Sequence, residues 1–238
     1  MANPANLSLL KAKIAEILTT ASWELSDTPA YNGTGGPGRL LEDLLSATAG
    51  NADTPDLDGW EIKFHGGTAL LTLFHKEALP VGSLIYVVEH HGWPGKTGTN
   101  INFRHTISGR TSRGFYVSRE TTRIVVRHDT DANVELYWEY DTLLNAMTSK
   151  CRRLAVVTGT VTTTDGCRQV RFHSAYLYWE PQREQFLQAI EHGDIFIDFD
   201  ARTTNGRGTS LRNHGTKFRI KPEYLPFIYS NNGIILPR

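Results

Sequence analysis

The stretch Pro55-Asp56-Leu57-Asp58-Gly59-Trp60-Glu61-Ile62-Lys63 decides how this chain of 238 residues is interpreted. Its second half, continued by Phe64, alternates with the period of a β-strand. Trp60, Ile62 and Phe64 occupy one set of alternating positions, and Glu61 and Lys63 occupy the other. Side chains two residues apart on a strand point to the same face of the sheet. The sequence therefore predicts a strand whose apolar face lies in the core and whose other face presents Glu61 beside Lys63.

The residue types in this stretch suit the hydrolysis of a phosphodiester. Asp56 stands before the strand, in a turn-like segment between Pro55 and Gly59, and can reach Glu61. Two carboxylates offer the hard oxygen ligands that Mg2+ binds, and a bound metal lowers the pKa of a water until it can act as a nucleophile. Lys63 can orient that water or offset the charge that develops on the phosphorane. The pattern resembles that of the PD-(D/E)xK nucleases, which cut phosphodiester bonds with Mg2+.

A purely structural reading of the same residues stays open. A Glu-x-Lys triplet is common on exposed, salt-bridged strand faces, and Pro-Asp begins many turns, so a short motif alone has a high false-positive rate. Asp58 is a competing carboxylate. We favour Asp56, since it follows Pro55 and precedes Glu61 by five residues.

Length and composition fit a single nuclease domain over residues 1–238, with room for two lobes around a DNA cleft. The sequence shows neither a membrane-spanning apolar run nor a secretory signal, and its two cysteines, Cys151 and Cys167, fit free thiols. These features predict a cytoplasmic protein that has no membrane partner.

The net charge of zero hides an asymmetry along the chain. Residues 1–100 hold 6 Lys and Arg against 11 Asp and Glu, whereas residues 101–238 hold 19 against 14. Six basic residues and no acidic one lie in 201–221, and six arginines lie in 101–128. Such basic blocks are typical of proteins that bind a polyanion, and the alternative is a solvated surface whose acidic partners come from other segments.

The hydrophobic periodicity predicts an α/β fold with a mixed central sheet flanked by helices. Helices are expected at 7–21, 39–47, 141–150 and 181–192, the last with Pro181 in its first turn. Strands are expected at 59–65, 69–75, 83–89, 114–120, 122–128, 134–140, 154–161, 169–179, 195–199 and 216–220. The first two strands are expected to form a hairpin at Gly66-Gly67. Residues 92–114 are interpreted as a long functional loop or a hairpin region, residues 203–213 as a loop, and 92–140 as a DNA-recognition insertion.

Beyond the motif, the chain resembles the MvaI/BcnI family of type II restriction endonucleases, most of all its BcnI-like members, and through them the MutH mismatch-repair nicking enzymes. The resemblance includes Gly38-Arg39-Leu40-Leu41-Glu42, which matches a helix that supplies a further glutamate in MutH-like proteins. It implies a PD-(D/E)xK, MutH-like nuclease fold. It also implies catalytic roles for Glu42, Asp56, Glu61, Lys63 and Lys150, and metal binding by Asp56, Glu61 and Ile62.

The family resemblance further implies a monomer with one cutting centre and no obligate protein partner. Such an enzyme would use Mg2+, with Mn2+ as a substitute, to cut double-stranded DNA at sites of the form CC-N-GG, with C or G at the centre. A MutH-like repair nickase and a non-catalytic DNA-binding module remain the alternatives.

The basic blocks supply the candidate DNA-binding residues. His214 is singled out because it stands among side chains that contact base edges and phosphates, and because its ring can donate or accept a hydrogen bond. The complete predicted set is Arg207, Arg212, Asn213, His214, Lys217, Arg219, His75, Arg104 and Arg110.

Overall fold

The fold is described from a computed structural model of the chain. The description covers residues 7–46, 57, 59–96, 99–111, 113–204 and 211–237. These residues divide into two compact units. The first consists of 1–71, 148–181 and 225–238, and the second of 72–147 and 182–224. Each unit is treated by itself below.

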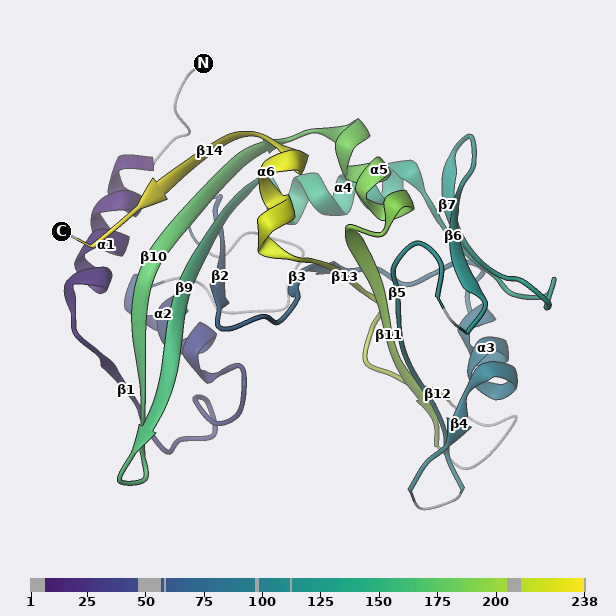
Figure 1. The fold of residues 1–238 in the computed structure, drawn as a ribbon, viewed down its shortest axis with the longest axis horizontal. Coiled ribbons are helices and arrows are strands. Elements are labelled where there is room, and N and C mark those ends of the chain that lie inside the picture. Colours follow the sequence, from purple (N-terminus) through teal and green to yellow (C-terminus); the bar gives the residue numbers. More distant parts are fainter. Residues whose placement is uncertain are drawn as a thin grey trace. The chain divides into compact units, whose positions relative to one another are not determined.

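The first unit is built on a curved sheet around the long β9–β10 hairpin (Figure 1). The strand order is β1-β10-β9-β2, and β14 pairs with β10 on the same edge as β1. Only the β2–β9 pairing is parallel among the pairs described in this sheet. The bounds are α1 Leu7–Thr19, β1 Trp23–Leu25, α2 Gly36–Leu45, β2 Glu61–His65, β9 Arg153–Thr164, β10 Cys167–Pro181, α6 Leu225–Ile228 and β14 Tyr229–Ile235.

One face of this sheet is buried under α1 and α2. Leu10 and Ile14 of α1 and Leu41 of α2 lie in one hydrophobic core with Trp60 and Ile62. The alternation that predicted an apolar face for β2 is therefore confirmed. Since neighbouring positions on a strand point to opposite faces, the other face of the sheet carries the polar residues of β2.

The second unit contains a six-stranded sheet with the order β3-β13-β11-β5-β4, in which β12 also pairs with β11, and a three-stranded sheet with the order β6-β7-β8. Its helices α3 and α5 pack on β11. The bounds are β3 Leu71–His75, α3 Ser83–His91, β4 Trp93–Pro94, β5 Ile101–Ile107, β6 Phe115–Arg119, β7 Arg123–His128, β8 Glu135–Glu139, α5 Arg183–His192, β11 Ile195–Thr203, β12 Leu211–Asn213, β13 Lys217–Ile220 and the 3-10 turn η1 Pro222–Tyr224. Helix α4, Tyr140–Cys151, begins in this unit and ends in the first.

The predicted α/β class and the mixed sheet are confirmed, but three local predictions are wrong. Residues 83–89 form helix α3 instead of a strand. The strands β2 and β3 belong to different sheets, so no hairpin turns at Gly66-Gly67. Pro181 ends β10, and Gln182 caps α5. The region 92–114 holds β4 and β5, which pair antiparallel, so of its two predicted forms the hairpin is confirmed.

Among the helices that the structure describes, none has the length and apolar character needed to cross a membrane.

Candidate functional site

The polar face of β2 holds the centre of the candidate active site. Glu61 is the first residue of β2, and its side chain is 1% exposed, whereas that of Lys63 is 23% exposed. The ammonium of Lys63 donates a hydrogen bond to Oε1 of Glu61. Two residues separated by one strand position therefore meet on one face, as the motif predicted. An ammonium beside a buried carboxylate offsets the cost of burying its charge and fixes the orientation of its oxygens.

A second lysine reaches the same carboxylate oxygen from a distant segment. Lys150 Nζ lies 3.8 Å from Oε1 of Glu61, and its side chain is 13% exposed. The cause is the chain path, because Lys150 stands in the last turn of α4 and β9 begins directly afterwards. In the parallel β2–β9 pairing, Leu154 is opposite Glu61. The structure thus brings together Glu61, Lys63 and Lys150 of the predicted catalytic set.

Two tyrosines that the sequence did not suggest complete the buried side of this site. The hydroxyl of Tyr229 donates to the backbone oxygen of Cys151 at 2.6 Å, and its ring centre lies 5.6 Å from that of Tyr178. Burial raises the pKa of Tyr178 to about 12. Burial also raises the pKa of Tyr229 well above its ordinary value, and the negative charge of Glu61 adds to the shift. Both phenols are neutral near neutral pH, and Tyr229 is near enough to Glu61 for its pKa to respond to that charge.

The remaining predicted catalytic and metal positions are Glu42, Ile62 and Asp56. Glu42 is half-buried on α2, which packs on β2. Gly38 stands four residues before Glu42, and residues four apart share a helix face. A Cβ built on Gly38 would lie 3.7 Å from the Cβ of Phe64 in β2. The helix face that carries Glu42 is therefore the one directed toward β2. Ile62 is buried in β2 and can offer only its backbone carbonyl as a ligand. Asp56 lies outside the described residues.

The described ranges contain no group of three or more His, Cys, Asp and Glu side chains that could hold a metal ion. Of the predicted carboxylate ligands, Glu61 is described and Asp56 is not.

A second set of predicted residues shares one face of the six-stranded sheet in the second unit. Strand β11 alternates so that Asp198, Asp200 and Arg202 are half-buried between buried apolar neighbours. Its register pairs Asp200 with Arg104 and Asp198 with Lys217. Paired residues point to the same face. This polar face, called the β11 face below, consists of Asp198, Asp200, Arg202, Arg104, Arg212, Lys217 and Arg219.

Ion pairs hold three basic side chains of the β11 face, those of Arg104, Lys217 and Arg219. Asp200 accepts from Nε of Arg104 at 3.0 Å, and the ammonium of Lys217 lies 3.8 Å from its other oxygen. Asp198 accepts from Arg219 at 3.1 Å. The two aspartates were not among the predicted site residues, although the alternation Ile197-Asp198-Phe199-Asp200 already places them on one face. Fixed arginine forks of this kind are suited to contact bases or phosphates with little further loss of side-chain freedom.

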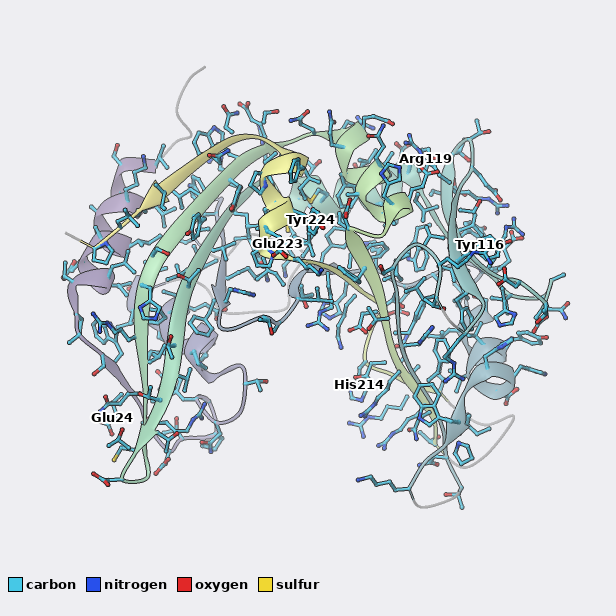
Figure 2. The ribbon with its side chains drawn as sticks, viewed as in Figure 1. Glu24, Tyr116, Arg119, His214, Glu223 and Tyr224 are labelled. Atoms are coloured by element: carbon cyan, nitrogen blue, oxygen red, sulfur yellow. The ribbon has the colours of Figure 1, made fainter. Side chains whose placement is uncertain are left out.

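The two histidines of the predicted DNA-binding set, His75 and His214, belong to neighbouring segments of the second unit. A Cβ built on Gly215 would lie 3.0 Å from the ring of His75. Gly215 directly follows His214 (Figure 2), whose backbone N–H donates to the carbonyl of Asp200 in β11. Glu77 anchors this turn, because it accepts hydrogen bonds from the Asn213 side chain at 2.5 Å and from the backbone of Thr216 at 3.0 Å. Glu77 is a further residue that the sequence analysis missed.

Two predicted DNA-binding residues stand apart from the β11 face. Arg110 forms an ion pair with Asp129 at 2.5 Å and lies over the ring of Tyr116 on the three-stranded sheet. Figure 2 shows Tyr116 on that sheet. Arg207 lies outside the described residues.

Comparisons with known proteins agree with this geometry. The model of the MvaI/BcnI restriction endonuclease family matches residues 12–229. A solved complex of restriction endonuclease MvaI with a cognate DNA substrate is 26% identical, with a TM-score of 0.83, over 99% of this chain and 100% of that one. MvaI solved in the absence of DNA is 24% identical over the same shares, with a TM-score of 0.57, and supports the fold alone. No curated protein sequence matches the chain.

The family match covers most of the chain and includes the strand that carries Glu61 and Lys63. The match to MvaI confirms the predicted nuclease fold. The chain therefore belongs to the MvaI/BcnI restriction endonuclease family and is a site-specific deoxyribonuclease of type II.

Proposed function

We propose that the chain cuts both strands of double-stranded DNA at the pseudopalindromic site CCSGG, in a reaction that depends on Mg2+ and leaves 5'-phosphate and 3'-hydroxyl ends. The observation that carries the proposal is the approach of Lys63 and Lys150 to one oxygen of the buried carboxylate of Glu61. The target site comes from the resemblance to BcnI-like enzymes. That MvaI was solved with a cognate DNA substrate supports DNA as the partner of this chain.

The donor set at β2 fits a hard divalent cation. Glu61 provides carboxylate oxygens and Ile62 a backbone carbonyl, and Asp56 is the predicted second carboxylate. Oxygen ligands of this kind suit Mg2+ or Mn2+ and do not suit a thiolate-binding metal. When bound, the cation supplies an activated water and neutralises charge on the scissile phosphate.

The protein's own residues then have distinct tasks. Lys63, which is partly exposed, is placed to orient the attacking water or to stabilise charge on the phosphorane. The more buried Lys150 holds Glu61 ionised and oriented, and is a positioning residue in this scheme. The buried, neutral phenol of Tyr229 lowers the local dielectric near Glu61 in this scheme, which strengthens both contacts.

The proposed enzyme is a monomer that contains one such centre and cuts the two strands one after the other. A single centre cannot act on two scissile phosphates at once, and a nearly symmetric site allows binding in two orientations. On supercoiled plasmid we expect nicked circles to precede linear DNA, with a rate that is linear in enzyme concentration. Direct conversion to linear DNA by a stable dimer would overturn this part of the proposal.

We also propose that the enzyme acts in the cytoplasm of a prokaryotic cell. Cys151 and Cys167 are both thiols, and only the second is exposed, which fits a reducing compartment.

A single digestion tests the target site. A long DNA of known sequence is incubated with the purified chain and Mg2+, and the fragment ends are mapped. We expect discrete fragments whose ends all fall within CCSGG. Random fragments, ends at another sequence, or no cutting of this DNA would contradict the proposal, and cutting only after a partner protein is added would indicate a repair nickase.

A further inference from the structure

The sheet face that carries Glu61 and Lys63 continues along the β9–β10 hairpin past the end of β2. His65, the last residue of β2, is opposite Thr158 of β9, and Thr158 is opposite Ser174 of β10. Residues that are opposite in register have side chains on the same face. The row formed by these three residues is therefore on the active-site face, next to Lys63.

Beyond this row the face carries polar side chains that reach solvent. Thr160 is opposite Arg171, and both are exposed. Thr158 and Ser174 are half-buried and share a hydrogen bond of 2.8 Å between their hydroxyls. We call this surface the outer track, and its residues are Thr158, Thr160, Arg171, His173 and Ser174.

An irregularity in β10 gives the outer track one additional side chain. The register with β9 shifts between Phe172 and Ser174, so that His173 is a bulged residue. Phe172 and Ala175 remain buried in the core on the other face. The ring of His173 lies 2.8 Å from the hydroxyl of Thr160. Bulges are frequent beside active sites, where they turn a side chain toward the functional face.

The outer track has the composition of a surface that binds phosphates. Its side chains are hydroxyls, an imidazole and a guanidinium, which are common phosphate ligands. Arg171 forms no ion pair within the described part of the chain, unlike Arg104 and Arg219 of the β11 face. The nearest acid in register is Glu24, opposite Gln169 one row farther out, and Figure 2 shows Glu24 at the outer end of the hairpin.

The spacing of the sheet sets how far the outer track lies from the cutting centre. Val156 is the residue of β9 opposite Lys63, and Thr160 stands four residues farther along β9. Four residues correspond to about 13 Å along the strand. In the perpendicular direction, β10 lies about 10 Å from β2. A base pair occupies about 3.4 Å of the duplex axis. For a duplex whose axis follows the strands, Thr160 and Arg171 are about four base pairs from the scissile phosphate, close to or beyond the end of a five-base-pair site.

We propose that the outer track binds backbone phosphates of the DNA that flanks the recognition sequence. This inference rests on the proposed function, because it assumes that the duplex lies against the face that carries Glu61 and Lys63. It assigns Arg171 as the charged contact and His173 and Thr160 as hydrogen-bonding neighbours. Such contacts carry no sequence information, and they fix the register of the duplex on the enzyme.

The test compares two duplexes that each contain one recognition site. One has short flanks of about two base pairs, which do not reach the outer track, and the other has long flanks of about ten base pairs, which extend past it. Binding is measured with Ca2+ over a range of salt concentrations. Wild type should bind the long duplex more tightly. Arg171→Ala should weaken binding to the long duplex roughly threefold to tenfold and lower its salt slope by about one, with no change on the short duplex.

Matched variants separate charge from shape and from folding. Arg171→Lys should keep the salt slope of wild type, because it keeps the charge. Lys11→Ala on α1, which covers the opposite face of the sheet, should bind both duplexes like wild type.

Arg171→Ala should still cut at a saturating enzyme concentration. The inference fails if Arg171→Ala cuts normally and binds the long duplex with the affinity and salt slope of wild type. The outer track would then be a solvated surface or a surface for a protein partner, and the proposed function would stand. If wild type itself does not cut, the proposed function fails.

Discussion

The ammonium of Lys150 lies 3.8 Å from the same Glu61 oxygen that accepts a hydrogen bond from Lys63. One lysine comes from the end of a helix and the other from the strand of the carboxylate itself. The two lysines differ in exposure, 13% for Lys150 and 23% for Lys63. In the proposed mechanism the more exposed lysine contacts the substrate, and the more buried one supports the carboxylate.

We expect Lys150→Ala to lower the single-turnover cleavage rate by about one to two orders of magnitude, less than the loss of a group that contacts the transition state. Its affinity for DNA should change little. Lys150→Arg should recover part of the rate, and Lys11→Ala, which alters an exposed lysine on α1, should cut like wild type. An unchanged rate for Lys150→Ala would remove Lys150 from the site.

The oxygen-rich donor set predicts how the enzyme responds to metal ions. Mg2+ or Mn2+ should support cutting, whereas Ca2+ should support binding with little cutting, because it is larger and less strict in geometry. The measurement is cleavage of one plasmid in each metal, with excess EDTA as the control. Full activity in EDTA would contradict the role assigned to Glu61 and Ile62.

The β11 face should contain two kinds of DNA contact. Lys217 is a point charge, and Lys217→Ala should weaken binding to all sequences and lower the salt slope by about one. Arg219 presents a fork held by Asp198, and Arg219→Ala should reduce discrimination between cognate and altered sites by about 1–3 kcal/mol. Competition binding with single-base variants measures both effects, and wild-type behaviour of both mutants would show that this face is not used.

An ion pair in the second unit predicts a dependence of stability on pH. The pKa of Asp131 is lowered from 3.8 to about 2, first by its hydrogen bond with His91 and further by Tyr86 and the Asn133 backbone. A carboxylate whose pKa is depressed by folding stabilises the folded state above its unfolded value, and the contribution disappears as the pH falls through the folded value. Asp131→Asn should therefore lower the melting temperature at pH 6.

The difference between Asp131→Asn and wild type should become smaller as the pH falls from about 4 to about 2. Asp165→Asn is the control, since Asp165 is exposed in the turn between β9 and β10 and its positive φ suits Asn, and it should melt like wild type at each pH. A difference for Asp131→Asn that does not change with pH would show that its ionisation contributes nothing.

Local periodicity predicted the face of β2 and the alternation of β11, because each strand has one buried face and one polar face. It failed at α3, where the apolar run Leu84-Ile85-Tyr86-Val87-Val88 suits a strand. Burial of Leu84, Val87 and Val88 follows helical spacing instead. A short apolar run fits either element, and here the packing of α3 against β5 and β11 decides.

Contacts between distant segments account for the other differences. Strand β2 pairs with β9 and strand β3 with β13, so the glycines between them do not close a hairpin. Strand β14 contains Asn231-Asn232-Gly233, a poor strand sequence that is held by pairing with β10. Tyr229 begins this strand, and for this reason its place beside Glu61 could not be read from the local pattern.

The most direct test of the account is the single-turnover cleavage rate of Glu61→Gln with Mg2+, measured beside its DNA affinity with Ca2+. Gln keeps the shape of the buried side chain and removes its charge. The rate should fall by roughly two to three orders of magnitude, and the affinity should stay within about threefold of wild type, a difference of less than 1 kcal/mol. Lys63→Ala should show the same pattern. Cleavage by either variant at a rate near that of wild type would contradict the assignment of the β2 face as the cutting centre.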